Sequence, residues 1–267
     1  MKTAIIGCGA IGQRLCDLIP ELVPEAGLSV VAERQEVHGA LRERLGQKLL
    51  LVSSADSLVE AGVTLAIECA GHSALREYGP ALLRRGVDLL VVSVGALADA
   101  PTETLLHRAA VDGGSKIRIP SGAAGGLDVL TAARLAGLER VAYRCVKPPA
   151  AWKGTPAQTM VDLERLKGST VFYSASAREA ARLFPQNANF AASVALAGVG
   201  FDDTTVELCA DPGATRNTHS VHANGVFGDI AFQINGVSLA TNAKTSLLTP
   251  YSVVRMLMNL CRPVVLA

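Results

Sequence analysis

The chain has 267 residues, a length that fits two compact domains or one large one. Hydrophobic residues make up 49% and charged residues 18%, which is enough apolar surface for a sizeable core and excludes a disordered protein. The 25 basic and 24 acidic side chains nearly cancel, so the chain lacks the field of a nucleic-acid or membrane-surface binder. These values favour chemistry on a small-molecule substrate, with neither nucleic acid nor membrane as a partner.

The six cysteines are spread along the chain without a C-x-x-C pair. This spacing predicts reduced thiols rather than a disulfide framework. The longest uncharged stretch, residues 183–201, is interrupted by Pro185 and three amide side chains, so we do not expect it to span a membrane. The first residues do not form the long apolar segment of a signal peptide. We therefore expect a cytoplasmic protein.

The first part of the chain alternates apolar runs with helix-like segments. The runs are continuously apolar, which is typical of parallel strands that are buried on both faces. Helices are expected over residues 73–85, where Gly86 follows as a cap, and over 102–111. These repeated β-α units indicate an α/β fold with a doubly wound parallel sheet. Its strands are predicted at residues 2–6, 28–32, 49–52, 63–67, 89–94 and 116–119.

The pattern changes beyond Pro120. Apolar and polar residues now alternate, which is typical of half-exposed strands. The dipeptides Asn224-Gly225 and Asn235-Gly236 favour hairpin turns, so we expect an antiparallel sheet in this part. A closing helix is expected to return to the first domain. The strands are predicted at residues 204–209 and 229–234, and the helix at 249–261.

A glycine motif directly follows the first predicted strand. In Gly7-x-Gly9-x-x-Gly12 the first glycine makes the turn, the second lets the backbone approach a pyrophosphate, and the third lets the helix pack on the strand. The helix that opens with Ala10 and Ile11 would place its N-terminus at the phosphates. The position of the motif between a strand and a helix predicts dinucleotide binding and a Rossmann-type first domain.

Glu33 and Arg34 end the second predicted strand, about 20 residues after the glycine motif. A carboxylate at this place accepts hydrogen bonds from the adenosine ribose of NAD, whereas an arginine pairs with the 2′-phosphate of NADP. The alternative for Arg34 is an ordinary solvated arginine. The two residues therefore leave NAD or NADP open as the cofactor.

Two histidines lie in a segment that reads as a strand, residues 217–222. Because side chains alternate along a strand, His219 would share a face with Val221 and Ala223, and His222 would lie on the other face. Two histidines so placed do not bind one metal ion, and no cysteine or carboxylate completes a ligand set, so we expect no metal site. A single histidine can act as an acid or base near neutral pH. The alternative is a surface or hydrogen-bonded core histidine.

Two further segments suit a nicotinamide ring. Residues 121–126 are rich in glycine and alanine, which let the backbone approach a flat ring. Residues 184–189 carry asparagines, whose amides can bond a carboxamide. The alternatives are a linker for the first segment and a helix cap for the second.

Four motifs accompany the glycine motif: residues 120–128 (PSGAAGGLD), 184–189 (FPQNAN), 217–219 (NTH) and 242–246 (NAKTS). Together they resemble the L-aspartate dehydrogenase family over nearly the whole chain. The glycine motif is common to many dehydrogenases, so the resemblance depends on these C-terminal motifs. One departure is Ala243, where the family pattern has a proline before the lysine.

The resemblance implies that His219 is the catalytic histidine and that Ala123 and Asn189 contact the nicotinamide cofactor. The implied reaction is the NAD(P)-dependent oxidative deamination of L-aspartate to oxaloacetate and ammonia through iminoaspartate, and its reverse. A homodimer and a role that feeds NAD biosynthesis are also implied. Other two-domain reductases, acting on homoserine, a semialdehyde or dihydrodipicolinate, remain an alternative, as does a non-catalytic dinucleotide-sensing regulator.

A dicarboxylate substrate needs cations, and the second domain offers three lysines. We take Lys244 as the candidate for the substrate carboxylates, with Lys147 and Lys153 also available, although each would ordinarily be a solvated surface lysine. The predicted domain limits are 1–120 for the Rossmann domain, completed by residues 247–267. Residues 121–246 are assigned to an α+β catalytic and dimerisation domain.

Overall fold

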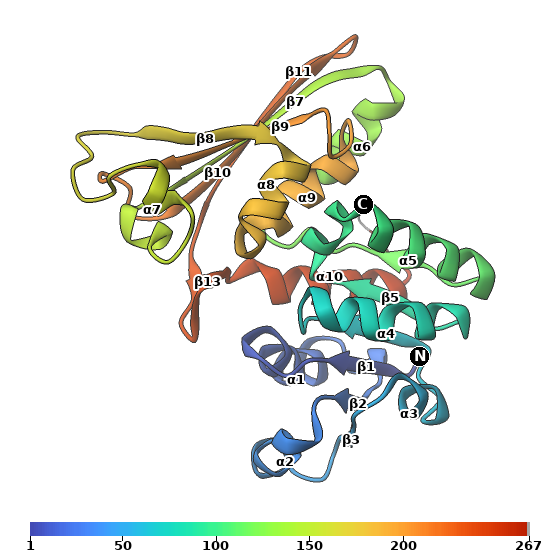
Figure 1. Cartoon of the computed structure of the whole chain (residues 1–267). Coiled ribbons are helices and arrows are strands. Elements are labelled where there is room, and N and C mark those ends of the chain that lie inside the picture. Colours follow the sequence, from blue (N-terminus) through green and yellow to red (C-terminus); the bar gives the residue numbers. More distant parts are fainter. Residues whose placement is uncertain (266–267) are drawn as a thin grey trace. The chain divides into compact units, whose positions relative to one another are not determined.

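The computed structural model describes residues 1–265, without the side chains of Gln186, Ala243 and Lys244. The chain divides into two compact units, which Figure 1 traces by sequence colour. The first unit holds residues 1–96, 100–122 and the chain from 249 onward, and the second holds 97–99 and 123–248. Over the described part of the chain, no helix has the length and apolar character needed to cross a membrane.

The first unit contains a six-stranded parallel sheet with the order β3-β2-β1-β4-β5-β6. The order reverses at β1, which pairs in parallel with β2 on one side and β4 on the other. This arrangement confirms the Rossmann-type doubly wound sheet. The strands are β1 (Thr3–Ile6), β2 (Leu28–Ala32), β3 (Leu50–Val52), β4 (Leu65–Glu68), β5 (Asp88–Val91) and β6 (Ile117–Arg118).

Helices cover this sheet because each presents an apolar stripe to the continuously apolar strands. One core cluster joins α1, α2 and α10 to side chains of β1, β2 and β4. Residues 92–94, predicted as strand, lie outside β5, and a 3-10 helix, η3, begins at Val94. The helices of this unit are α1 (Ala10–Leu22), α2 (His38–Leu45), α3 (Ala55–Glu60), α4 (His72–Arg84), α5 (Ala100–Gly113) and α10 (Leu248–Cys261), with η1 (Pro24–Ala26), η2 (Gln35–Val37) and η3 (Val94–Ala98) between them.

The second unit contains a five-stranded sheet with the order β11-β10-β7-β9-β8. The expectation of a purely antiparallel sheet is wrong, because β7 and β9 pair in parallel and the sheet is mixed. The long connection between these two strands holds β8, α8 and α9, which makes a parallel pairing possible. The strands are β7 (Leu138–Lys147), β8 (Thr170–Ser176), β9 (Thr204–Ala210), β10 (Asn217–Gly225) and β11 (Gly228–Gly236).

The hairpin between β10 and β11 turns at Val226 and Phe227. The two predicted turn dipeptides instead lie inside the paired strands, since Asn224 pairs with Asp229 and Gly236 pairs with Asn217. A short two-stranded sheet of β12 (Ser238–Leu239) and β13 (Asn242–Ser246) follows. The helices of this unit are η4 (Pro149–Trp152), α6 (Leu127–Leu135), α7 (Ala157–Met160), α8 (Ala177–Leu183), η5 (Pro185–Asn187) and α9 (Ala188–Ala197).

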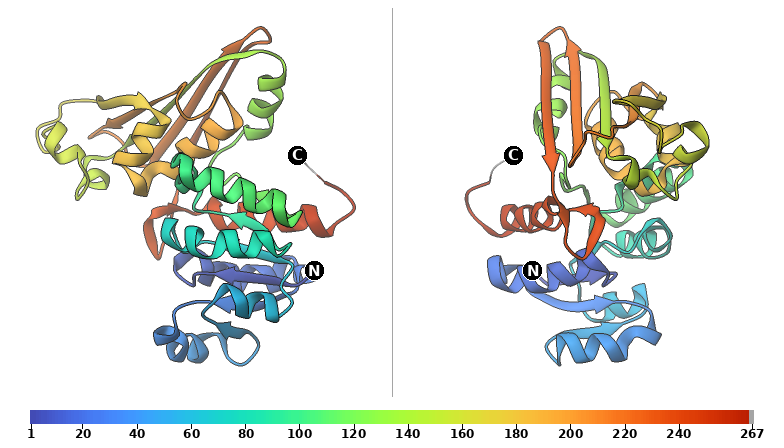
Figure 2. Two further views of the ribbon diagram at one scale, coloured as in Figure 1. Left: turned by 45° about the vertical axis from the view of Figure 1, so that its right-hand side comes forward. Right: turned by 90° about the vertical axis from the view of Figure 1, so that its left-hand side faces the viewer.

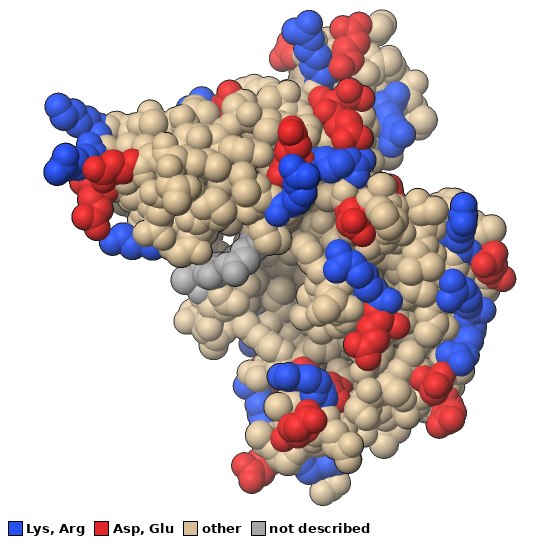
Figure 3. Space-filling model, in the orientation of Figure 1, with Lys and Arg blue, Asp and Glu red and all other residues tan. Residues whose placement is uncertain are grey.

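The five-stranded sheet has one covered and one open face. Helices α8 and α9 pack against β7, β8 and β9, and Figure 2 shows the two helices together on one side of the sheet. On β7, side chains at 141, 143 and 145 are buried, whereas those at 140, 142 and 144 are exposed. Basic and acidic side chains are interspersed on the surface seen in Figure 3, without a large patch of one sign. This distribution fits a small-molecule protein better than a nucleic-acid binder.

Candidate active site

The glycine motif lies between β1 and α1, and its three glycines have three different surroundings. Gly7 has φ +90°, and a Cβ atom there would lie 2.5 Å from Ala70 Cβ. A Cβ at Gly12 would lie 2.0 Å from the Gly7 carbonyl oxygen, so only glycine lets α1 pack on the strand. Beside Gly9, by contrast, no heavy atom of the described residues lies within 4 Å of such a Cβ. Gly9 therefore leaves open space for a bound group.

This open space adjoins the N-terminus of α1, where Ala10 and Ile11 form the first turn. Within the described structure no side chain caps this helix end, so its backbone N–H groups and the positive end of its dipole are available to an anion. A pyrophosphate matches these requirements. The glycine motif thus fits the phosphates of a dinucleotide.

Glu33 and Arg34 directly follow β2, at the same edge of the sheet. The Glu33 carboxylate accepts hydrogen bonds from the backbone N–H of Cys8 at 2.9 Å and of Arg34 at 3.0 Å. It is therefore held against the glycine loop, and its side chain is 21% exposed. The Arg34 side chain is 81% exposed and reaches the Glu33 carboxylate only at 3.9 Å. Arg34 is therefore able to swing towards a bound phosphate.

A buried carboxylate that the sequence analysis missed supports the same edge. Glu68 ends β4, is fully buried, and accepts hydrogen bonds from the backbone N–H groups of Ala70, Gly71 and Ser93 and from the Ser93 hydroxyl. Burial raises the pKa of Glu68, and the hydrogen bonds oppose this rise. The Glu68 side chain thus joins the segments that follow β4 and β5. Ala70, in the first of these segments, lies so close to Gly7 that a side chain at Gly7 would clash with it.

In the second unit, His219 lies on the covered face of the sheet. Val221 and Ala223, on the same face of β10, are 0% and 3% exposed, whereas His222 is exposed on the open face. The predicted assignment of the two histidines to opposite faces is therefore confirmed. His219 itself is half-buried.

An aromatic stack holds the His219 ring. Phe190 of α9 stacks on His219 with ring centroids 4.5 Å apart and on Tyr143 of β7 with centroids 4.8 Å apart. The Tyr143 hydroxyl oxygen lies 2.7 Å from His219 Nδ1, and the two rings are within 6° of parallel. The imidazole is thus fixed through Nδ1, which leaves Nε2 as the ring nitrogen for chemistry.

Cys145 and Lys147 follow Tyr143 on the same face of β7. Burial raises the pKa of the Cys145 thiol, but Lys147 and then His219 outweigh this effect and bring the pKa to about 7. The half-buried Lys147 ammonium donates a hydrogen bond to the Asn187 side-chain oxygen and lies 5.1 Å from the centre of the Trp152 ring. A positioned cation therefore lies on the same sheet face as His219.

The two segments predicted to suit a nicotinamide border this face. Cβ atoms at Gly125 and Gly126 would meet Ile234 at 3.3 Å and Phe232 at 2.9 Å, so the glycine-rich segment passes close to β11. Ala123 is half-buried in that segment. Asn189 is exposed in the first turn of α9, next to Phe190. Ala123, Asn189 and His219 all belong to the second unit.

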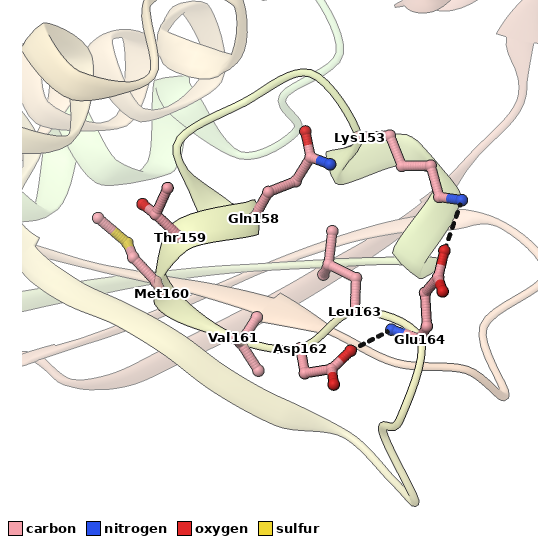
Figure 4. Close-up of a pocket in the computed structure, with 8 residues that line it drawn as sticks. All are labelled: Lys153, Gln158, Thr159, Met160, Val161, Asp162, Leu163 and Glu164. Carbon is pink, nitrogen blue, oxygen red and sulfur yellow. Dashed lines mark hydrogen bonds and ion pairs between the residues drawn. The ribbon is translucent and has the colours of Figure 1, made fainter.

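Of the other two candidate lysines, only Lys153 has a described side chain. Lys153 borders an exposed pocket lined by residues 158–164, where its ammonium lies 3.4 Å from the Glu164 carboxylate (Figure 4). None of the residues that line this pocket belongs to the aromatic stack. Lys244 lies in β13, but its side chain is outside the described residues.

Sequence reasoning missed Tyr143, Cys145 and Phe190. The alternation of Val141, Tyr143 and Cys145 with the smaller or charged residues Ala142 and Arg144 was the available signal for β7. For Phe190 no local signal exists, because its role comes from packing across the sheet. Among the described side chains no group of three or more histidine, cysteine or acidic residues could hold a metal ion.

Comparisons with known proteins agree with these features. Residues 7–120 match a family model described as homoserine dehydrogenase, NAD binding domain, and residues 128–260 match one described as aspartate dehydrogenase, C-terminal. L-aspartate dehydrogenases of Cupriavidus necator and Pseudomonas aeruginosa are 43% and 44% identical to the chain, each over 97% of both chains.

Solved structures extend the likeness to the fold. A crystal structure of aspartate dehydrogenase from Thermotoga maritima matches with a TM-score of 0.76 and 27% identity, over 100% of this chain and 99% of that one. An archaeal homoserine dehydrogenase in complex with NADPH matches with a TM-score of 0.57 and 13% identity, over 95% and 96%. At that identity the second likeness concerns the fold alone.

Proposed function

Because the chain belongs to the L-aspartate dehydrogenase family, we propose that it oxidises L-aspartate with NAD or NADP. Aspartate, water and the oxidised cofactor give oxaloacetate, ammonia, the reduced cofactor and a proton, and the reverse reaction aminates oxaloacetate. The single observation that carries the proposal is the relationship of more than 40% identity over nearly the whole chain. The match to the homoserine dehydrogenase model is confined to the NAD binding domain, and the solved homoserine dehydrogenase, at 13% identity, shares the fold alone.

The residues of the first unit fit the cofactor. The open space at Gly9 and the N-terminus of α1 would hold the pyrophosphate, and Glu33 or Arg34 would hold the adenosine ribose or its 2′-phosphate. In the second unit, Ala123 and Asn189 would contact the nicotinamide. When bound, the nicotinamide ring supplies a hydride acceptor for the α-hydrogen of aspartate.

His219 is the proposed catalytic residue. Hydrolysis of iminoaspartate requires that water lose a proton as its oxygen bonds to the imine carbon, and that the departing nitrogen gain one as the C–N bond breaks. His219 Nε2 would take the first proton and return it in the second step. The stack against Phe190 and the bond from Nδ1 to Tyr143 fix the ring for both transfers.

Lys147 is the better supported of the three lysines for a substrate carboxylate. It lies on the same sheet face as His219, and Asn187 and Trp152 hold its ammonium in place. A preordered cation loses little side-chain entropy when it binds an anion. Lys244 keeps its earlier assignment as a proposal, since nothing described bears on its side chain.

A spectrophotometric assay tests the function. The purified chain is mixed with NADH or NADPH, oxaloacetate and ammonia, and the loss of reduced-nicotinamide absorbance is followed. Oxidation that requires both oxaloacetate and ammonia is expected. Oxidation with oxaloacetate alone would indicate a hydroxy-acid reductase, and binding of the cofactor without turnover under any substrate would indicate a sensor.

We further propose a homodimer that works in the cytoplasm and feeds NAD biosynthesis with iminoaspartate. The open face of the five-stranded sheet supports the dimer, because its centre carries the exposed residues Ala142 and Ala231. All six cysteines are free thiols, which supports a reducing compartment.

A further inference from the structure

Glu68 is a buried carboxylate of the first unit that takes no part in the proposed chemistry. It ends β4 and is 0% exposed, and among the described residues no other acidic or basic side chain is buried. Its Oε1 atom accepts hydrogen bonds from the backbone N–H groups of Ala70 and Gly71 at 2.9 and 2.8 Å and from the Ser93 hydroxyl at 2.9 Å. Its Oε2 atom accepts one from the Ser93 N–H at 3.2 Å. An ionised carboxylate, which only accepts, satisfies all four donors. Burying a charge is costly even when it is hydrogen-bonded, so packing alone does not account for this residue.

The hydrogen bonds of Glu68 fix two segments at the edge of the parallel sheet. In the strand registers Glu68 lies at the end of β4, between the ends of β1 and β5. Ala70 belongs to the turn after β4, and Ser93 belongs to the segment after β5. A Cβ atom at Gly7 would lie 2.6 Å from the Ala70 Cα atom, so the turn after β4 packs directly on the glycine motif. One buried side chain therefore holds this turn against the glycine motif and joins it to the segment after β5.

These two segments lie on one side of the glycine motif, and Glu33 lies on the other. A dinucleotide binds across the carboxyl ends of the strands where the strand order reverses, which here is at β1. With the pyrophosphate at Gly9 and the adenosine ribose at Glu33 after β2, the nicotinamide half would extend towards β4 and β5. Open space is present there, because a Cβ atom at Gly71 would meet no described heavy atom within 4 Å beyond its chain neighbours, as at Gly9, and Ala70 is exposed. The backbone that Glu68 holds therefore borders the nicotinamide side of the site.

We propose that Glu68 is a positioning residue for the cofactor, which holds the segments after β4 and β5 in the shape that receives the nicotinamide half of the dinucleotide. Glu33 fixes the adenosine side in a similar way, through the backbone N–H groups of Cys8 and Arg34. Glu33 is partly exposed and can also reach a ribose, whereas the buried Glu68 acts only through its hydrogen bonds within the protein. The inference rests on the dinucleotide binding that the proposed function uses, and it does not depend on the identity of the substrate.

Glu68→Gln tests this role with little change of shape. The amide oxygen can keep the hydrogen bonds made at Oε1, but the NH2 group then faces the Ser93 N–H, donor against donor. Because a buried donor without an acceptor is costly, the segment after β5 should shift. We expect the Kd of NADH to rise about tenfold or more, the equivalent of losing one such hydrogen bond. The Kd of AMP, which fills only the adenosine side, should stay within about threefold. Isothermal titration of the full-length protein measures both constants, and AMP binding shows that the first unit is folded.

Two further variants separate positioning from general stability. Ser93→Ala removes one hydroxyl but keeps the three backbone hydrogen bonds, so its Kd for NADH should stay within about threefold of the wild-type value. Should Glu68→Gln not fold, Glu68→Asp, whose carboxylate is withdrawn by one methylene group, should show the same selective loss. An unchanged affinity of Glu68→Gln for NADH, or an equal loss of its affinity for AMP, would overturn the positioning role. A wild type that binds NADH but does not oxidise aspartate would contradict the proposed function alone.

Discussion

At Gly9 a side chain of one hydrogen atom keeps the space beside the N-terminus of α1 open. Gly9→Val would fill the position that we assign to the pyrophosphate, so the affinity for NADH should be abolished. Because nothing described lies within 4 Å of the new Cβ, the fold should tolerate the change. Calorimetric titration with NADH measures the effect. Gly168→Val, at another open glycine, is the control, and unchanged NADH binding by Gly9→Val would contradict the assignment of the phosphate site.

We expect Arg34 to provide a charge that distinguishes NADPH from NADH. Glu33 is held by two backbone N–H groups, whereas the Arg34 guanidinium is largely solvated and free to meet a 2′-phosphate. Arg34→Ala should weaken NADPH binding by about 1 to 2 kcal/mol, near or below the lower end of the range for hydrogen bonds to charged groups, since solvent screens an exposed pair. The dissociation constant of NADH should change by no more than a few-fold. Equal losses of affinity for NADH and NADPH would mean that Arg34 does not bind the 2′-phosphate.

Lys147 and Lys153 form a matched pair of lysines in one unit. Lys147 lies on the sheet face of His219, whereas Lys153 pairs with Glu164 at an exposed pocket. Lys147→Met should raise KM for aspartate by about 10- to 100-fold, the effect of losing a hydrogen bond between charged groups, and should leave the Kd of NADH unchanged. Lys153→Met should have no effect on either. Steady-state kinetics measure the effect, and similar KM values of the two variants for aspartate would remove Lys147 from the substrate site.

The two faces of strand β10 separate its histidines. His219 meets Tyr143 and Phe190, whereas His222 is exposed on the other face. His219→Ala should lower kcat by about 100-fold or more, as expected when an acid–base group is lost, while cofactor binding persists. His222→Ala should leave kcat within about twofold. If the two variants behave alike, or if His222→Ala is the inactive one, the catalytic assignment of His219 is wrong.

Strands of the first unit could be predicted because they are buried on both faces and read as continuous apolar runs. In β1 and β4 all four residues are buried. The strands of the second unit were harder to predict, since β7 and β8 are not continuously apolar and are only partly buried. The parallel pairing of β7 with β9 joins segments about 60 residues apart, and no local pattern specifies such a pairing.

The same difference between local sequence patterns and tertiary contacts applies to the candidate site. Gly7, Gly9 and Gly12 form a local motif, and Glu33 follows the next strand at the distance that this motif predicts, so the sequence alone predicts their positions in the fold. Glu68 looks in the sequence like the end of an ordinary strand, and its role comes from N–H groups after β4 and β5 that meet only in the folded sheet. Tyr143 and Phe190 likewise meet His219 only through tertiary packing.

At the scale of the whole molecule, the proposed function assigns different roles to the two units. The first would hold the phosphates at a helix N-terminus and a glycine motif, and the second would supply His219, held by its aromatic stack, and Lys147, held by Asn187 and Trp152. Helix α10, at the other end of the chain from β1, contributes Val253, Val254 and Leu257 to the core of the first unit. The second unit is thus an insertion between two segments of the first, which ties its two ends to one scaffold.

The open sheet face of the second unit predicts how two copies of the chain associate. Ala142 and Ala231 lie on either side of His222 in the registers of β7, β10 and β11, and all three are exposed. The two alanines leave room on either side of His222 for side chains of a second copy of the sheet, packed across a two-fold axis. Ala142→Glu combined with Ala231→Glu would put four carboxylates into such an interface. Burying unpaired charges is costly, so light scattering should find a dimer for the wild type and a monomer for the double variant.

Leu135→Glu, at an 89% exposed position, should remain dimeric. A monomeric wild type would refute the homodimer, and a dimeric double variant would place the interface on another surface.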